Sequence, residues 1–403
     1  MHVPLVTSPA QETYQLLELP PELEAHIEAG PATLHFLGRL SDEAVLVTQD
    51  ATYAVRQVLQ SNSRLLCSVE TALDGDVQLR LRENVRETLE VVRTSALLDR
   101  LATLLQDDMY MGPADEVEQR HYTPAEVKSI VQASEAELLE GRRTYHILEL
   151  DGFWRRVAPD VVLDLLRSLL AHLDIFACSP DRVPFARMCD ALAPRACRAV
   201  AQAVVGDWFC ASVPRSLDTP PAYVSLARAS IVQFMGRHVL QTHKRMPLRA
   251  FLDAWHQQVG QALQADVQLT LLQGHYLLYP PPATMTESSP HTPLPPTPAA
   301  LALADTMTIQ SFSHTWLPTA PAQRFQELFL MRPQWIREEL VPFIAPLATS
   351  PSGIESLLLK HGRSLRARWS STHAQVLLHG QLTPPASSAP VPCTLYQARV
   401  KYA

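Results

Sequence analysis

The chain has 403 residues, of which 47% are hydrophobic and 19% are charged. This length exceeds that of one ordinary domain and predicts two to four domains, with enough apolar residues to form buried cores. No run of about 18 apolar residues occurs, which excludes a membrane-spanning helix. The start, Met1–Pro4, lacks the basic and apolar regions of a secretion signal. We therefore expect an intracellular chain without membrane contact.

The net charge of −7 conceals a gradient along the chain. Residues 1–140 hold 10 Lys and Arg against 24 Asp and Glu, residues 141–320 hold 15 against 13, and residues 321–403 hold 9 against 4. An acidic beginning and a basic end predict different partners, although acidic residues also simply keep a first domain in solution. The six cysteines form no C-x-x-C pair. This spacing favours free thiols in a reducing compartment over a zinc site.

The first part of the chain has the pattern of short strands separated by turn formers. Strands are predicted at residues 16–19, 32–37, 44–48, 52–58 and 64–69. Their regular spacing is typical of a meander or small barrel. A strand layer this small has open edges and a thin core, and pairing with partner strands would stabilise it. Apolar residues at three- and four-residue steps predict a trailing helix over 85–107. We assign residues 1–110 to a β-rich assembly domain.

The next segment carries the sharpest local signals. Thr123-Pro124-Ala125-Glu126 is a helix start with a capping box, and Ser134-Glu135-Ala136-Glu137 is a second one eleven residues later. The pair Asp151-Gly152 between two apolar runs is a strong hairpin signal. Two capped helices followed by a hairpin predict a winged helix over residues 118–158.

This layout recurs towards the end of the chain. Helices are predicted at residues 247–259, 267–272, 324–329, 336–344 and 354–362, and a hairpin is predicted around Gly274. Eight prolines in residues 280–298 indicate a semi-rigid linker. We therefore assign residues 159–280 to a helical region with a second winged helix, 281–317 to the Pro-rich linker and 318–403 to a third winged helix. The predicted fold class is α+β, a small barrel-like domain followed by tandem winged helices.

Motifs of catalysis and of cofactor binding are absent from the sequence. It contains no G-x-x-x-x-G-K-[ST], G-x-G-x-x-G, H-E-x-x-H or G-x-S-x-G pattern. Only 13 glycines occur, which is too few to suggest the loops that hold phosphates in most nucleotide enzymes. We therefore predict that the chain is not an enzyme and name no catalytic residue, cofactor or metal ligand.

Basic residues beside aromatic ones are the remaining candidates for a site. Arg142 and Arg143 lie at the second predicted helix, and Arg155 and Arg156 follow Trp154 on the predicted hairpin. In winged helices these two elements face the major groove and the DNA backbone, where arginine binds phosphate. In the alternative interpretation, Trp154 anchors the hairpin to the core and the arginines are solvated.

The densest cationic stretch lies near the end of the chain and consists of Lys360, Arg363, Arg366 and Arg368, with Trp369 next to it. The local excess of positive charge favours contact with phosphate, and a solvated surface is an equally weighted alternative. These eight basic residues are the predicted contacts to DNA or to a polymerase.

Several stretches of the chain, taken in order, resemble a known family. They are Leu16-Leu17-Glu18-Leu19, Ala51-Thr52-Tyr53, Ser61-Asn62-Ser63, Tyr122-Thr123-Pro124, Gln132-Ala133-Ser134-Glu135-Ala136-Glu137, Gly152-Phe153-Trp154-Arg155, Val183-Pro184, Phe251-Leu252-Asp253-Ala254-Trp255, Arg324-Phe325-Gln326-Glu327-Leu328-Phe329, Gln334-Trp335 and Pro342-Phe343-Ile344. Together they resemble the Dcc-one family of sister-chromatid-cohesion proteins. The stretches within 122–156 and 324–344 are the most specific.

The resemblance implies a subunit of an alternative replication factor C clamp loader, with the partners Ctf-eighteen and Ctf-eight. In this family the N-terminal part combines with strands of both partners. The winged helices are associated with single- and double-stranded DNA and with DNA polymerase epsilon, so that the loader places PCNA at leading-strand forks in the nucleus. ATP hydrolysis belongs to other subunits, and no catalytic residue is carried over.

Two other functions are compatible with tandem winged helices. One is a sequence-specific regulator of transcription, which requires base-reading side chains on a recognition helix. Glu137, Leu138 and Leu139 on the second predicted helix are not of that kind. The other is a cullin-type ubiquitin-ligase scaffold, in which winged helices contact only protein. Co-purification of loader subunits, of a promoter fragment or of a ligase module distinguishes the three.

Overall fold

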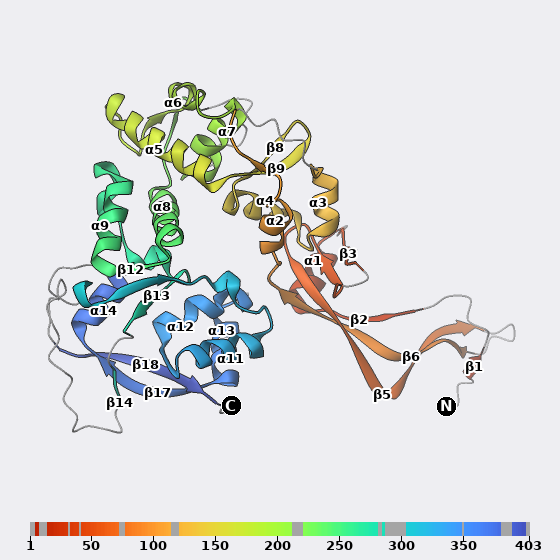
Figure 1. The fold of residues 1–403 in the computed structure, drawn as a ribbon. Coiled ribbons are helices and arrows are strands. Elements are labelled where there is room, and N and C mark those ends of the chain that lie inside the picture. The colour runs from red at the N-terminus through yellow and green to blue at the C-terminus, as the bar shows by residue number, and fades with distance from the viewer. Residues whose placement is uncertain are drawn as a thin grey trace. The chain divides into compact units, whose positions relative to one another are not determined.

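The structure, a computed structural model, describes residues 5–7, 14–30, 33–39, 42–71, 77–113, 121–211, 221–280, 284–286, 304–348, 350–379 and 389–399. The chain forms two compact units. Unit 1 comprises residues 1–101 and 124–141, and unit 2 comprises residues 102–123 and 142–403. Helices and several small sheets alternate along the chain (Figure 1). The predicted α+β class is confirmed.

Unit 1 is built on one open sheet. Its strands are β1 (Leu5–Thr7), β2 (Leu16–Glu18), β3 (His35–Leu37), β4 (Val45–Val47), β5 (Thr52–Thr71) and β6 (Val77–Thr94). The order is β1-β6-β5-β4-β3, and β2 also pairs with β6. Helix α1 (Pro21–Glu28) buries Leu23 against Leu46, Tyr53 and Val91. Within the described ranges no strand pair joins the two ends of this path, so the predicted barrel-like closure is not present.

Strands β5 and β6 form a long antiparallel ribbon. The pairing runs from Thr52↔Thr94 to Thr71↔Val77, with register shifts after Leu59 and after Leu66. The strands predicted at 52–58 and 64–69 are therefore two parts of one strand, β5. The other strands cover only parts of the ribbon: β4 pairs with residues 52–54 of β5, and β2 pairs with residues 88–90 of β6.

The helix predicted over residues 85–107 is wrong for most of its length. Strand β6 continues to Thr94, and only α2 (Asp99–Leu104) is helical. Val85, Thr88 and Val91 are β-branched residues, which suit a pleated surface better than a helix. Their main chain pairs with β5. Local periodicity does not reveal this pairing, because the partner strand lies elsewhere in the sequence.

The two predicted helices after the hinge are present. They are α3 (Pro124–Ile130) and α4 (Glu135–Thr144). The second capping box is confirmed: Ser134 Oγ accepts a hydrogen bond from the Glu137 main-chain N–H at 3.2 Å. The Glu137 carboxylate in turn accepts one from the Ser134 main-chain N–H at 2.9 Å. This pair of bonds fixes where α4 begins.

Gln132, between the two helices, attaches the helix pair to the sheet of unit 1. Its side chain is buried; Nε2 donates to the carbonyls of Leu37 at 3.2 Å and Glu43 at 2.6 Å, and Oε1 accepts from Arg100 Nη1 at 2.9 Å. Thr52 Oγ1 of β5 donates to the Glu137 carboxylate at 2.5 Å. The stretch Gln132–Glu137, which carries much of the family resemblance, is therefore a joint between helices and sheet.

Replacing Gln132 by Ala should destabilise unit 1. The variant loses three hydrogen bonds: the two carbonyls lose this donor, and the Arg100 guanidinium keeps only Asp42, which costs roughly 2–4 kcal/mol. Urea denaturation monitored by circular dichroism measures the loss. The matched control is Gln49→Ala at an exposed position, for which we expect a change within about 0.5 kcal/mol. Equal denaturation midpoints for the two variants would contradict the role of Gln132.

The predicted hairpin is confirmed as β8 (Ile147–Leu150) and β9 (Phe153–Val157). Asp151 and Gly152 have φ values of 52° and 85°, as the two-residue turn requires. The hairpin lies in unit 2, where β9 also pairs with β7 (Met109–Tyr110). The helix pair lies mostly in unit 1, because Gln132 and Glu137 bind the sheet there. The segment predicted as one winged helix, residues 118–158, is therefore divided between the two compact units.

The described part of unit 2 repeats one order of elements three times: a helix, a short strand, a helix, a further helical segment and then strand structure. This last part is two strands in the second and third repeats, and one strand with an isolated bridge in the first. The first repeat, residues 159–226, contains α5 (Pro159–Ile175), β10 (Val183–Pro184), α6 (Phe185–Leu192), α7 (Arg198–Ala203), the π-helix η1 (Val204–Trp208), a bridge from Cys210 to Leu226 and β11 (Tyr223–Val224). The second, residues 228–311, contains α8 (Arg228–His243), β12 (Arg245–Pro247), α9 (Leu248–Val259), the 3-10 helices η2 (Gln261–Asp266) and η3 (Leu269–Leu272), β13 (Tyr276–Tyr279) and β15 (Thr308–Ser311).

The third repeat, residues 321–398, contains α11 (Pro321–Met331), β16 (Gln334–Ile336), α12 (Arg337–Ile344), the 3-10 helix η5 (Ala345–Leu347), α13 (Pro351–His361), β17 (Gly362–Trp369), an additional helix α14 (Ser371–His379) and β18 (Val391–Ala398). In each repeat the first strand pairs antiparallel with the last: β10 with β11, β12 with β15, and β16 with β18. The helices predicted at 247–259, 324–329, 336–344 and 354–362 are confirmed.

Other predictions in this region need correction. Only Leu269–Leu272 of the helix expected at 267–272 is helical, and the hairpin around Gly274 is not formed, because β13 pairs with β15. The region 159–280 holds the first repeat and most of the second. The predicted linker 281–317 includes β15, whose Ile309 is buried in the second sheet, and η4 (His314–Trp316). It also includes β14 (Thr284–Thr286), which pairs with β17. The prolines from Pro290 to Pro298 lie outside the described residues.

Candidate nucleic-acid interface

The candidate interface is the junction of α13 and β17 in the third repeat. Ser350 caps α13 by accepting a hydrogen bond from the Gly353 N–H at 3.2 Å. Gly362 ends the helix and begins the strand. A Cβ at Gly362 would lie 3.0 Å from both the Leu358 carbonyl oxygen and Tyr396 Cδ1, so this close approach favours glycine. The chain therefore passes directly from α13 into β17.

The predicted cations Lys360, Arg363, Arg366 and Arg368 are all exposed at this junction. Cross-strand neighbours on β18 are neutral: Gln397 lies opposite Arg363, Thr394 opposite Arg366 and Pro392 opposite Arg368. In the part of the chain that the structure describes, none of the four takes part in an ion pair or a side-chain hydrogen bond. Their positive charge is therefore not compensated locally, which is the property of a phosphate-binding surface.

The alternation of β17 orients two of these arginines. Ala367 and Trp369 are buried, and Arg366 and Arg368 alternate with them along the strand. Successive side chains of a strand point to opposite faces, so these two arginines lie on the exposed face. Arg399, which the sequence reasoning missed, follows the end of β18 and donates a hydrogen bond to the Leu359 carbonyl, with a donor–acceptor distance of 2.7 Å. Its proximity to Lys360 depends on the β17–β18 pairing, which no sequence signal announced.

The four other predicted cations are used inside the chain. The Arg142 guanidinium lies 4.8 Å from the centre of the Trp154 ring, and Arg143 pairs with Asp207 at 2.7 Å. Trp154 itself is buried, as in the alternative interpretation of this cluster. Burial lowers the pKa of Arg142 from its ordinary value. The arginines are thus part of the packing of the hairpin rather than freely solvated.

On β9 the two remaining arginines have partners from the preceding segment. Arg155 donates to the Met109 carbonyl at 3.2 Å and lies 3.4 Å from the Asp108 carboxylate, which also pairs with His121 at 2.7 Å. Arg156 donates to the Ala102 carbonyl at 3.5 Å, and burial lowers the pKa of Arg156. Of the eight predicted contacts, only the four at the α13–β17 junction are therefore free of such intramolecular bonds within the described residues.

Two buried arginines shape the third repeat and were not singled out from the sequence. Arg324 donates to the carbonyls of Leu317, Pro318 and Phe343. Arg332 donates to the Leu278 carbonyl of β13 and lies 3.5 Å from the Glu339 carboxylate. The contact with the Leu278 carbonyl joins the third repeat to the second. No signal in the sequence distinguished these arginines from the exposed ones.

Neither metal-ligand clusters nor membrane-spanning helices are found in the described ranges. No group of three or more His, Cys, Asp or Glu side chains there has the arrangement of a metal site. No helix there is long and apolar enough to cross a membrane. The α13–β17 junction is thus an exposed, positively charged surface.

Known proteins are similar to this chain over most of its length. The family described as "Sister chromatid cohesion protein Dcc1" matches residues 14–344. Relatives named sister chromatid cohesion protein DCC1 include those of Xenopus tropicalis, 27% identical over 87% of this chain and 86% of the relative, and Mus musculus, 25% identical over 87% and 84%. The Homo sapiens protein of that name is 24% identical over 90% and 88%. The chain belongs to the family of sister chromatid cohesion protein Dcc1.

Proposed function

We propose that this chain is a non-catalytic subunit of an alternative replication factor C-like clamp loader and serves sister chromatid cohesion in the nucleus. The observation that carries the proposal is the family match over residues 14–344, which spans both units. The relatives are named for cohesion. In this proposal the other subunits hydrolyse ATP and load PCNA, while this chain supplies docking surfaces.

The three repeats of unit 2 are winged helices in this proposal. Each has the helix-turn-helix order followed by strands. In the second and third repeats the last strand lies between the first strand and the middle one, in the orders β12-β15-β13 and β16-β18-β17. Winged helices of this kind dock on DNA or on protein without catalysing a reaction. This arrangement supports a docking role for unit 2.

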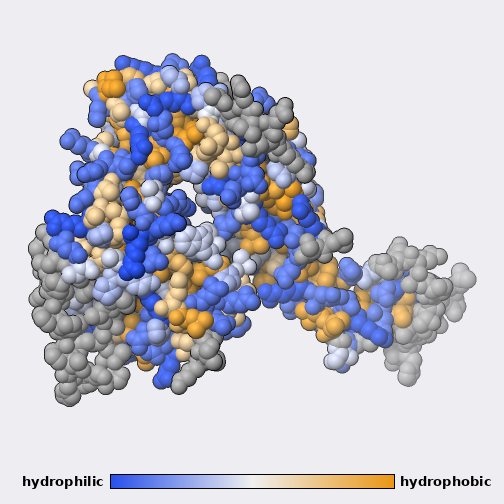
Figure 2. Space-filling model, in the orientation of Figure 1, coloured by the Kyte–Doolittle hydropathy of each residue, from blue (hydrophilic) through white to orange (hydrophobic). Residues whose placement is uncertain are grey.

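The β5–β6 ribbon of unit 1 is the surface that we assign to the partners Ctf-eighteen and Ctf-eight. Leu59 and Val69 are 75% and 71% exposed on it, and Leu65 and Val77 are exposed as well. Figure 2 shows hydrophobic surface along this part of unit 1. An open sheet with exposed apolar side chains is stabilised when partner strands add to its edges. The ribbon is therefore suited to assembly with strands of other subunits.

The α13–β17 junction is the surface that we assign to single- and double-stranded DNA. Its four uncompensated cations support binding to the phosphate backbone without base reading. DNA polymerase epsilon is the further partner of this proposal. The arginines of α4 and of the hairpin are engaged within unit 2 and are therefore less available to DNA phosphate, so we assign the polymerase contact to the surface of the first repeat and the hairpin.

Co-purification tests the proposal. The tagged full-length chain should recover the large and small partner subunits together with the loader ATPases. The double variant Leu59→Asp/Val69→Asp should recover less than about a tenth of them, because two charges would be buried among partner strands. The control Leu359→Asp alters a residue of the third repeat that is 65% exposed and should leave recovery unchanged.

One result would count against this function, and another would count only against the assembly surface assigned to it. Recovery of a cullin-type ligase module or of a specific promoter fragment in place of loader subunits would favour one of the rival functions. Undiminished recovery of loader subunits by the double variant would keep the loader but remove the ribbon from its assembly surface.

A further inference from the structure

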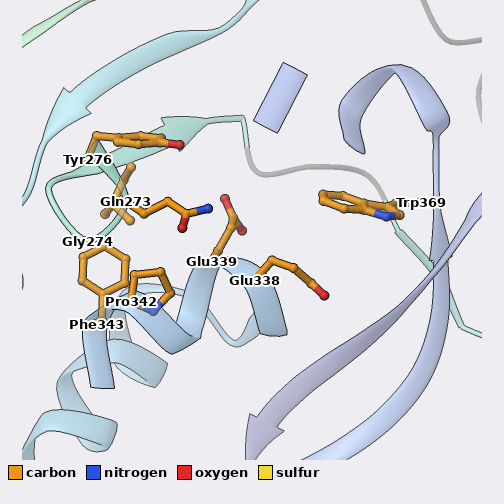
Figure 3. A pocket seen from close by; sticks show the side chains of 9 residues that line it. Gln273, Gly274, Tyr276, Glu338, Glu339, Pro342, Phe343 and Trp369 are labelled. Carbon is orange, nitrogen blue, oxygen red and sulfur yellow. The ribbon is translucent and has the colours of Figure 1, made fainter. Parts of the chain in front are cut away.

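One face of β17 is turned towards the interior of unit 2. Ala367 and Trp369 on this face are buried. Trp369 lines a small cavity together with Glu338 and Glu339 of α12, and Figure 3 shows these side chains around it. This inner face therefore gives a phosphate neither access nor positive charge.

The opposite face of β17 presents three exposed polar side chains in a row, Ser364, Arg366 and Arg368. They lie two residues apart, so that successive side chains start about 7 Å from each other along the strand. Neighbouring phosphates of one nucleic-acid strand have a similar separation. Within the described ranges the two arginines form no ion pair, and the Ser364 hydroxyl makes no hydrogen bond. The row can therefore offer one donor to each of three successive phosphates.

The helix before β17, α13, has no cation along its solvent-facing stripe. In a winged helix the corresponding helix enters the major groove of DNA. The exposed residues at helical spacing on α13 are Ser352, Glu355, Ser356 and Leu359, and the basic residues of this helix are confined to its last turn. Glu355 is an anion that is already paired with Arg337. The stripe therefore lacks the positive charge that would hold α13 between the two phosphate strands of a groove.

Resting on the assignment of DNA to the α13–β17 junction, we propose that the third repeat binds one phosphate strand lengthwise along β17 and that α13 stays outside the major groove. Arg368, Arg366 and Ser364 contact successive phosphates in this arrangement. Ser364 is thus a further phosphate ligand, since hydroxyl groups commonly donate to phosphate oxygens. A complementary strand is compatible with this contact but adds nothing to it.

Modified duplexes test this binding mode on the full-length chain, with fluorescence anisotropy as the measurement. Glucosylated hydroxymethylcytosine fills the major groove and should leave the affinity within about twofold of that for the unmodified duplex. A duplex with neutral methylphosphonate linkages in one strand should bind as the ordinary single strand does, within about threefold, because one charged strand remains for β17. Neutral linkages in both strands should abolish binding.

Two outcomes would overturn the proposal. Weakening of more than about tenfold by glucosylation would show that the protein inserts an element into the major groove. Binding of the half-neutral duplex as weak as that of the fully neutral one would show that both strands are contacted. Failure of the unmodified duplex and of the single strand to bind would instead refute the assignment of DNA to the junction itself.

Ser364→Ala tests the third member of the row. It should weaken binding to duplex and single strand about threefold, through the loss of one hydrogen bond, and leave the salt dependence unchanged, because the hydroxyl carries no charge. Ser364→Thr retains the hydroxyl and should restore the affinity. The matched control is Ser352→Ala, an exposed serine on the outer stripe of α13, which should bind as the unaltered chain does. Equal affinity of Ser364→Ala and the unaltered chain would remove Ser364 from the row.

Discussion

Reversal of the three strand arginines, as Arg363→Glu, Arg366→Glu and Arg368→Glu together, should weaken DNA binding by at least about 100-fold at low salt. The three side chains are exposed and face neutral neighbours across the strand pair, so no intramolecular bond is lost with them. Each phosphate contact contributes about 0.9 to the slope of log K against log salt on duplex DNA. Loss of three contacts should make this slope shallower by roughly 2 to 3.

Fluorescence anisotropy with one labelled duplex and one labelled single strand, at several salt concentrations, measures both quantities. The matched control is Arg198→Glu, Lys244→Glu and Arg245→Glu, which changes the net charge equally at exposed positions outside β17. A control variant that loses as much affinity and slope would show that the total charge of unit 2 matters and its placement does not. An unchanged slope in the β17 variant would exclude these arginines from the interface.

Acidification from pH 7 to pH 5 should lower the stability of unit 2 by roughly 2 kcal/mol through His146 alone. The His146 ring packs against the rings of Trp208, Phe209 and Phe234 at centroid distances of 5.2 to 5.3 Å. Burial, aided by the charges of Arg156 and Arg237, lowers its pKa from 6.5 to about 3. His146 therefore binds a proton below about pH 6.5 in the unfolded chain, but only below about pH 3 in the folded chain. Stability is complete above pH 6.5 and falls as the pH decreases below that value.

Urea denaturation at pH 7 and pH 5 measures this loss. His146→Phe keeps a ring in the aromatic cluster and removes the titrating group, so it should lessen the difference in stability between the two pH values by about 2 kcal/mol. His275, whose pKa burial also lowers to about 3, should account for a further part of the difference. The exposed His243→Gln serves as control. A pH dependence that His146→Phe leaves intact would show that the ring is protonated within the fold.

Signals confined to a few neighbouring residues were sufficient to predict parts of this fold. The capping box of Ser134 and Glu137 and the turn at Asp151-Gly152 depend on main-chain groups within three residues, and both occur as the sequence indicates. The helix predicted for residues 85–94 was wrong because the spacing of their apolar residues fits a helix as well as a strand of the ribbon. These residues form a strand because they pair with β5, and no local sequence pattern encodes that pairing.

For the candidate site, too, features set by neighbouring residues could be predicted, and contacts between distant residues could not. The cations from Lys360 to Arg368 could be singled out because they follow one another closely along one helix end and one strand. Arg143 and Arg155 have equally conspicuous positions in the sequence, yet Asp207 and Asp108 bind them in the fold. A partner 64 or 47 residues away cannot be recognised from composition or spacing. Exposure of a cation is therefore a property of the fold and not of its sequence neighbourhood.

The strands on either side of the proline-rich tract have a consequence for dissecting the chain. Thr284–Thr286 adds to the sheet of the third repeat, and Thr308–Ser311 completes the sheet of the second. A protease that cuts between these two segments would leave two fragments. The first would contain β14, which belongs to the sheet of the third repeat, and the second would contain β15, which belongs to the sheet of the second repeat. The nicked protein should elute as one species, and residues 228–399 hold both repeats together with all of their sheet partners.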